Sequence, residues 1–230
     1  MAKVSNKTIS KVVKKKWFKI YAPQMLGNAF VGESFVDSQE KLLGKTITAN
    51  LGTLTNKSKN SYVNVKLLCD KLIGKDGAGT NIIDYNMSSS AIKRMVRLRR
   101  DRLDASFVCE TKDNKFVRVK YMIITVSNAS TTKKTLLRNA ARALIAKYVM
   151  SMPYEDFANS VIGFGMQGDM RKALSKIYPV KSVDIRQFTL VEKKTFTFIE
   201  KGEGFDISKL QSQKKPVKEK EEEDTTGQES

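Results

Sequence analysis

Histidine is absent from the 230-residue sequence, and this absence excludes the commonest forms of hydrolytic chemistry. A Ser-His-Asp triad, a Cys-His nucleophile pair and a histidine metal ligand all need an imidazole. The scattered carboxylates, such as Glu155, Asp156 and Asp169, show no spacing that singles out an acid/base pair. These observations exclude an enzyme that depends on histidine.

Cysteine is almost as scarce. The two cysteines, Cys69 and Cys109, lie far apart, and each sits in a run of alternating apolar residues. A zinc site needs clustered Cys or His ligands, and a disulfide framework is typical of short, cysteine-dense secreted chains. Neither pattern is present, so we predict two buried thiols and no metal or other cofactor.

Long apolar runs are missing as well. No uncharged stretch is long enough to cross a bilayer, and the basic N-terminus is followed by more lysines where a signal peptide would have its apolar segment. These absences predict a cytoplasmic protein without a membrane partner.

Acidic residues are few beside basic ones. The chain has 24 Asp and Glu against 42 Lys and Arg, a formal net charge of +18 at pH 7. An excess of this size attracts polyanions at long range. Nucleic acid is the first partner that it predicts, and an anionic membrane surface is the second. Since 40% of the residues are apolar, most of the chain should still fold around a core.

Composition divides the chain into three parts. Residues 1–16 carry six lysines and no acid, and we expect a disordered basic arm because they can bury little apolar surface. Residues 17–212 should form a single α+β core that binds RNA. Residues 213–230 are a low-complexity, charged tail that we expect to be disordered.

Hydrophobic periodicity predicts the elements of this core. The expected strands cover residues 46–51, 62–69, 81–85, 105–111, 116–126 and 183–186, and the fourth and fifth form a hairpin. The expected helices run from residues 88–90 to near 102, from 131 to 152, and over two shorter segments around residues 157 and 173. Without regular βαβ alternation, they predict an α+β fold with a largely antiparallel sheet, open or closed into a barrel, and flanking helices.

Basic residues cluster on two of the expected helices. In residues 92–103, the cations are mostly arginines, whose planar guanidinium pairs bidentately with phosphate and stacks on bases. On the helix at 131–152, a spacing of four predicts a positive ridge opposite the apolar stripe. A solvated face explains any single cation, but several clusters together with the net charge favour phosphate binding. The candidate contacts are Lys93, Arg94, Arg97, Arg99, Arg100, Arg102, Lys133, Lys134, Arg138 and Arg142, with Arg186 on the closing strand.

Cations and aromatics alternate in residues 14–21. If this segment is extended, Trp17, Lys19 and Tyr21 share one face, and Phe18 and Ile20 share the other. The exposed rings could stack on bases; the alternative is that they cover an edge of the domain. The candidate RNA contacts here are Lys14, Lys15, Lys16 and Trp17.

One motif offers an enzymatic alternative. The segment from Gly163 to Gly168 fits G-x-G-x-x-G, which a dinucleotide-binding enzyme would place between a strand and a helix. The segment that precedes it has the pattern of a short amphipathic helix, so a loop between two helices is the simpler interpretation. A free nucleic-acid-binding protein is another alternative, because the composition alone allows it.

One set of segments matches a known pattern in order along the chain: residues 15–23, 32–34, 43–46, 95–104, 111–113, 117–120, 177–180 and 183–186. Together they resemble the archaeal form of the S3Ae family of archaeal and eukaryotic small-subunit ribosomal proteins. They include the family's opening, its arginine-rich segment, its hairpin and its closing strand. The chain departs from the family pattern at Leu98, where a basic residue is usual.

The resemblance implies a β-rich core with flanking helices and no catalysis. It implies a structural role in translation on the platform of the small subunit, near the mRNA exit and the 3′ end of the ribosomal RNA. The implied partners are small-subunit ribosomal RNA, neighbouring small-subunit proteins and mRNA near the exit, and the implied location is the cytoplasmic ribosome.

Overall fold

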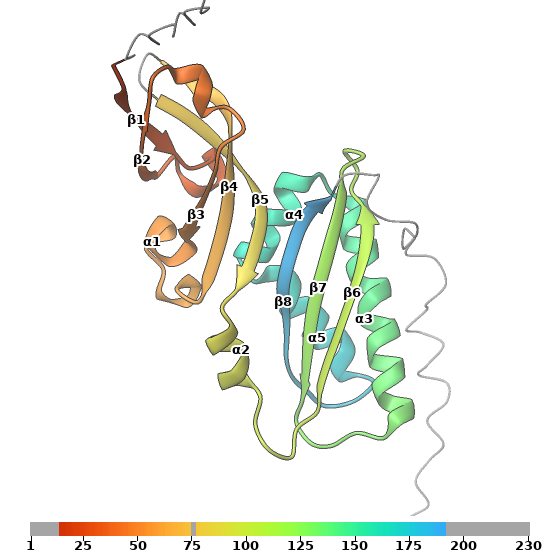
Figure 1. The fold of residues 1–230 in the computed structure, drawn as a ribbon. Helices are drawn as coiled ribbons and strands as arrows, with labels where there is room; N and C mark the ends of the chain where they lie inside the picture. Colours follow the sequence, from red (N-terminus) through yellow and green to blue (C-terminus); the bar gives the residue numbers. More distant parts are fainter. Residues whose placement is uncertain (1–13, 75–76, 192–230) are drawn as a thin grey trace, which may run out of the picture.

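The computed structural model describes residues 14–74 and 77–191, which form one eight-stranded sheet and five α-helices (Figure 1). The strands are β1 (Lys16–Tyr21), β2 (Phe30–Val36), β3 (Thr46–Asn50), β4 (Val63–Ile73), β5 (Gly77–Met87), β6 (Arg102–Glu110), β7 (Phe116–Thr125) and β8 (Val180–Val191). The helices are α1 (Leu51–Thr55), α2 (Ser89–Met95), α3 (Thr131–Ser151), α4 (Tyr154–Ile162) and α5 (Gly165–Ser175), with short 3₁₀ turns η1 (Gln24–Leu26), η2 (Gln39–Leu42) and η3 (Ser58–Asn60). Of the strand pairs, β1–β5 is parallel and the others are antiparallel. The predicted α+β fold with a largely antiparallel sheet is confirmed.

Strand β5 joins the two halves of the molecule. One edge of β5 pairs with β4 along its length, and the other edge pairs with β1 at residues 77–79 and with β8 at residues 84–86. The first half contains β1 to β4 and α1, and the second contains β6 to β8 and α3 to α5 (Figure 1). Because β5 belongs to both halves, one sheet runs through the whole described chain.

The barrel alternative is wrong. Within the described residues, β2 pairs only with β1 and β3 only with β4, so the sheet does not close on itself. The turn η2 packs against β2, β4 and β5 instead, and its Leu42 is fully buried. A helical turn therefore covers this end of the sheet, over a small apolar cluster that includes Phe18, Ile20 and Cys69.

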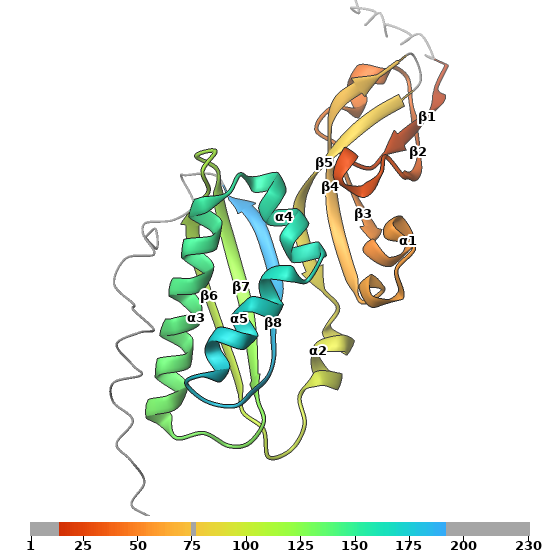
Figure 2. The same cartoon turned by 180° about the vertical axis from the view of Figure 1, so that it is seen from behind.

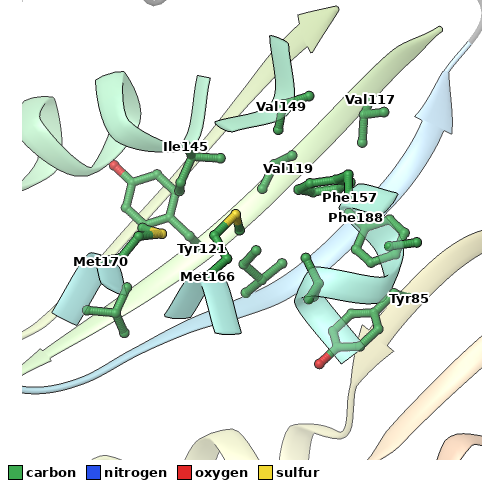
Figure 3. Packing of buried hydrophobic residues seen from close by; sticks show 14 of the residues in the cluster. Tyr85, Val117, Val119, Tyr121, Ile145, Val149, Phe157, Met166, Met170 and Phe188 are labelled. Atoms are coloured by element: carbon green, nitrogen blue, oxygen red, sulfur yellow. The ribbon is translucent and has the colours of Figure 1, made fainter. Parts of the chain in front are cut away.

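Helices α3, α4 and α5 cover one face of β6, β7 and β8 (Figure 2). The apolar stripe predicted within residues 131–152 is the buried face of α3. The centre of the core is aromatic: Phe188 stacks on Tyr85 and meets Phe157 edge-on (Figure 3). Both predicted thiols, Cys69 and Cys109, are free and buried, as the sequence predicted.

Parts of the predicted organisation lie outside the described residues. These parts are the basic arm at 1–16, apart from its last three residues, the charged tail at 213–230, and residues 192–212 of the expected core. Strand β1 begins at Lys16, one residue before the predicted start of the core. The three-part division stays a prediction.

Asp184 on β8 makes the stability of the fold depend on pH. Burial raises the pKa of this carboxyl, against the smaller opposing effect of a hydrogen bond with the Ser182 side chain. The folded chain therefore keeps a proton that the unfolded chain loses above about pH 4, so the free energy of unfolding falls as the pH rises from there through the folded-state pKa.

Replacing Asp184 with Asn removes this titration. At pH 7 the variant should be more stable than the parent chain by on the order of 1 kcal/mol, because no charge has to be buried. Near pH 4 the two chains should unfold almost alike. Urea titrations at both pH values test this expectation, and a difference that does not change with pH contradicts it.

Candidate nucleic-acid interface

The arginine-rich segment is a loop, and its prediction as a helix that ends near Arg102 was wrong. Helix α2 ends at Met95, Arg99 has a left-handed backbone with φ 60°, and β6 begins at Arg102. Leu98 is 94% exposed, so further helical turns would have had no apolar side chain to bury. From Arg102 onward the backbone instead forms a ladder with β7. The arginines are therefore presented from a turn.

Asp101 fixes the base of this loop. Its backbone N–H donates to Oγ1 of Thr125 at 2.9 Å, and its carbonyl accepts the backbone N–H of Thr125 at 3.0 Å. Its carboxylate accepts the backbone N–H of Ala129 at 2.7 Å and pairs with Nζ of Lys134 at 2.9 Å. These two contacts, the Ala129 N–H first, hold the pKa of Asp101 below its ordinary value. The loop is thus tied to β7 and to the start of α3.

Positively charged side chains lie close together beside the loop. Desolvation, followed by the charges of Arg100 and Arg97, lowers the pKa of Lys181 on β8. Nη1 of Arg100 is buried, and no described residue accepts a hydrogen bond from it. Within residues 14–74 and 77–191, no carboxylate pairs with Arg97, Arg99 or Arg100. Concentrated positive charge and a guanidinium nitrogen without an acceptor suit an oxyanion such as phosphate.

These cations lie at one end of the second half. The loops that follow α2, β7 and α5 reach this end together (Figure 1), and the backbone N–H of Val126 donates to the carbonyl of Pro179 at 3.1 Å between two of them. Helix α3 begins here and adds an exposed lysine in its first turn. We call this region the arginine-loop surface, and it consists of Arg97, Arg99, Arg100, Lys133 and Lys181.

Two predicted RNA contacts are ion-paired within the chain. Lys134 is held by Asp101, as described above, and Nη2 of Arg102 lies 2.6 Å from Oδ2 of Asp104. Both cations are partly buried. These pairs lie at the base of the loop and at the start of β6, and each cation still adds positive charge to this end.

The other predicted cations of the second half are more dispersed. Lys93 and Arg94 are exposed in the last turn of α2, where positive charge also interacts favourably with the helix dipole. Arg138 is exposed on α3, one turn beyond Lys134, and Arg142 is half-buried one turn further. Arg186 is half-buried in the middle of β8, away from the loop.

The predicted N-terminal contacts lie at the opposite end of the molecule from the arginine loop (Figure 1). Residues 14–17, which include all four of them, are exposed. The alternation predicted for an extended segment is confirmed, because Phe18 and Ile20 are buried while Trp17 is 64% exposed. The ring of Trp17 lies 4.9 Å from that of Phe35 on β2. The structure therefore separates the predicted site into two groups.

The glycine motif does not form a dinucleotide loop. Gly163 ends α4, Phe164 has a left-handed backbone with φ 58°, and Gly165 begins α5. A dinucleotide site needs a strand before the glycines, and here a helix precedes them. The simpler interpretation, a turn between two helices, is confirmed.

In residues 14–74 and 77–191, no three Cys, Asp or Glu side chains are grouped as ligands for a metal ion. None of the helices described there combines the length and the apolar character that crossing a membrane requires.

The structure brings two residues into these groups that were not predicted from the sequence. Lys181 reaches Arg97 and Arg100 from a strand far along the chain, and no local pattern marks it. Phe35 lies in β2, where Gly32 and Glu33 interrupt the apolar alternation that would have indicated a strand.

Known proteins resemble the chain over nearly all of its described part. The model of the ribosomal S3Ae family matches residues 3–194. Small ribosomal subunit protein eS1 of Methanothrix thermoacetophila is 29% identical over 187 residues, which cover 81% of this chain and 88% of that protein. Proteins of the same name from Thermoplasma volcanium and Archaeoglobus fulgidus are 28% and 27% identical, cover 82% and 77% of this chain, and are themselves covered to 87% and 84%.

Proposed function

Because the chain belongs to the ribosomal S3Ae family, we propose that it is a structural constituent of the small ribosomal subunit and binds ribosomal RNA there. The archaeal relatives named as small-subunit proteins support the choice of subunit. The observation that carries RNA binding is the arginine-loop surface, where Arg97, Arg100 and Lys181 gather and Nη1 of Arg100 lacks an acceptor among the described residues.

The arginine-loop surface binds phosphates of folded RNA. Arg97 and Arg100 supply planar donors for bidentate contacts, and Lys181 adds a point charge beside them. Helix α3 extends the same surface along its exposed side through Arg138. Contacts of this kind position the protein by the shape and backbone of the RNA and do not read its sequence.

The resemblance of the sequence to S3Ae proteins supports a finer location. In this proposal the protein occupies the platform of the small subunit near the mRNA exit, next to the 3′ end of the ribosomal RNA, in the cytoplasm. Neighbouring small-subunit proteins and mRNA leaving the ribosome are then its other partners. Residues 14–16 contact phosphates from the opposite end of the molecule.

Sedimentation of the tagged protein from its own cells tests the ribosomal role. Lysate is run on a sucrose gradient with and without magnesium chelation, and each fraction is blotted. The protein should move with the small subunit after the subunits separate, and it should resist a moderate salt wash. A protein that stays at the top of the gradient contradicts the proposal and favours an RNA-binding role outside the ribosome.

Replacing Arg97, Arg99 and Arg100 together with Ala should weaken incorporation into small subunits. The loop loses three phosphate-binding cations, while Asp101 still fixes its base. The measurement is the fraction of tagged protein that sediments with small subunits beside an untagged wild-type copy. If the variant and the parent chain are incorporated equally, the protein binds RNA through another surface.

A further inference from the structure

The outer face of β1 and β2 exposes four aromatic rings in two pairs. Trp17 stands opposite Phe35 in the ladder, and their ring centroids are 4.9 Å apart. Tyr21 stands opposite Phe30, with centroids 6.4 Å apart. The exposed fractions of Trp17, Phe35 and Phe30 are 64%, 50% and 55%. We call these four residues the aromatic face.

The two ring pairs are spaced along the strand with a lysine between them. Trp17 and Tyr21 are four residues apart, which is about 13 Å along a strand. Lys19 projects from the same face midway, opposite Glu33 on β2. A single strand that lies along β1 can therefore place one base on each ring pair and a phosphate near Lys19.

Further cations surround the rings. Nζ of Lys15 lies 5.9 Å from the ring centre of Phe35. A hollow of about 780 Å³ opens beside the strand, and Lys16, Trp17, Lys19 and Tyr21 line it. Glu33 is the one carboxylate among the described residues that line this hollow. The surroundings of the rings are thus predominantly positive.

This combination favours RNA over a protein neighbour. The centres of protein interfaces are depleted of charged residues, and lysine in particular is rare there. On this face, lysines alternate with the rings instead of surrounding an apolar centre. The RNA must also be single-stranded at this point, because the faces of paired and stacked bases are not available to side chains.

We propose that the aromatic face of β1 and β2 binds single-stranded RNA, with bases stacked on the Trp17–Phe35 and Tyr21–Phe30 pairs and phosphates held by Lys15, Lys16 and Lys19. This surface lies at the opposite end of the molecule from the arginine-loop surface (Figure 2). It extends the proposed function from folded RNA to an unpaired segment. Its test uses the isolated full-length chain, so its result is independent of assembly into the small subunit.

Trp17 is the only tryptophan in the chain, so its fluorescence reports on this face alone. The probe is a ten-nucleotide single strand of mixed sequence, and the controls are the same strand annealed to its complement and inorganic polyphosphate. The single strand should quench the fluorescence of Trp17, because a base stacks on the indole, whereas the duplex and polyphosphate should leave it nearly unchanged. Equal quenching by polyphosphate overturns the proposal.

Substitutions separate stacking from charge. With a fluorescent label on the strand and its anisotropy as the readout, Trp17→Ala should lower the affinity for the single strand about 5- to 150-fold, and Trp17→Phe should restore part of it. Leu43→Ala is the matched control, because Leu43 is 46% exposed in the same half but has no ring. Arg97→Ala with Arg100→Ala should leave the quenching at saturation intact.

The two proposals can fail separately. If Trp17→Ala and Phe35→Ala bind the single strand as tightly as the parent chain, the aromatic face does not bind RNA, and a protein neighbour becomes its better partner. That result leaves sedimentation with the small subunit untouched. Quenching by the single strand together with failure to sediment would overturn the ribosomal role and keep the aromatic face as an RNA site.

Discussion

Replacing Phe188 with Ala is expected to lower the free energy of unfolding by about 3–5 kcal/mol. Phe188 is fully buried on β8, where its ring stacks on Tyr85 with centroids 5.1 Å apart. The edges of Phe157 and Tyr154, at 5.3 and 6.2 Å, complete its surroundings. The substitution therefore leaves a cavity where β5, β8 and α4 meet. Urea unfolding of the full chain, followed by circular dichroism, measures the loss.

The control removes a phenylalanine ring that lies at the surface. Phe35 is half exposed on β2 and loses only its cross-strand pairing with Trp17, so Phe35→Ala should lower the free energy of unfolding by no more than about 1 kcal/mol. If Phe188→Ala costs no more than Phe35→Ala, the core does not depend on this aromatic cluster. The stability of Phe35→Ala also shows that any loss of RNA binding by this variant comes from the missing ring on the aromatic face and not from unfolding.

Local sequence patterns were sufficient to predict the helices and strands that pack against the core through one face. The hairpin of β6 and β7 and helix α3 were predicted close to their observed bounds, and α4 and α5 lie where two short helices were expected without stated bounds. Each has an apolar periodicity that matches its buried side, because each lies against the main core on one face only. The burial of Cys69 and Cys109 followed from the same alternation.

The failed predictions have separate physical reasons. The stretch from Arg97 to Arg100 has good helix formers, but its one apolar side chain, Leu98, is exposed, so local propensity did not decide its structure. The open sheet depends on η2, whose packing against β2, β4 and β5 no local pattern reveals. The length of β5 was underestimated because glycines occupy its first residues.

The residue types of the candidate site could be predicted from the sequence, but their arrangement in space could not. Clusters of arginine and the net charge indicated phosphate binding, and the resemblance to a family of ribosomal proteins implied that the partner is RNA. The sequence could not show that Lys134 and Arg102 are ion-paired, that Lys181 joins Arg97 and Arg100, or that Trp17 lies at the other end of the molecule. Membership of a family of ribosomal proteins confirms the prediction that the chain is not an enzyme.

Replacing Arg97 and Arg100 together with Ala should weaken binding to purified small-subunit ribosomal RNA about 10- to 100-fold at 0.1 M salt. Each phosphate contact contributes nearly one unit to the slope of log K against log salt concentration, so two lost contacts lower the magnitude of that slope by about 2. The loss should be similar for different RNA sequences, since phosphates carry no sequence information. Filter binding over a range of salt concentrations gives both quantities.

A second double variant tests whether binding depends on where the positive charges lie or only on how many there are. Lys112→Ala with Lys147→Ala removes the same charge from exposed positions on the β6–β7 turn and α3, away from the arginine loop. If binding depends only on the total charge of the chain, both double variants weaken it equally, and the arginine-loop surface is not a site. If the loop binds phosphates directly, the control keeps nearly the parent slope.

Arg97→Lys with Arg100→Lys then retains the slope of the parent chain but binds less tightly, because lysine supplies the charge without the bidentate geometry.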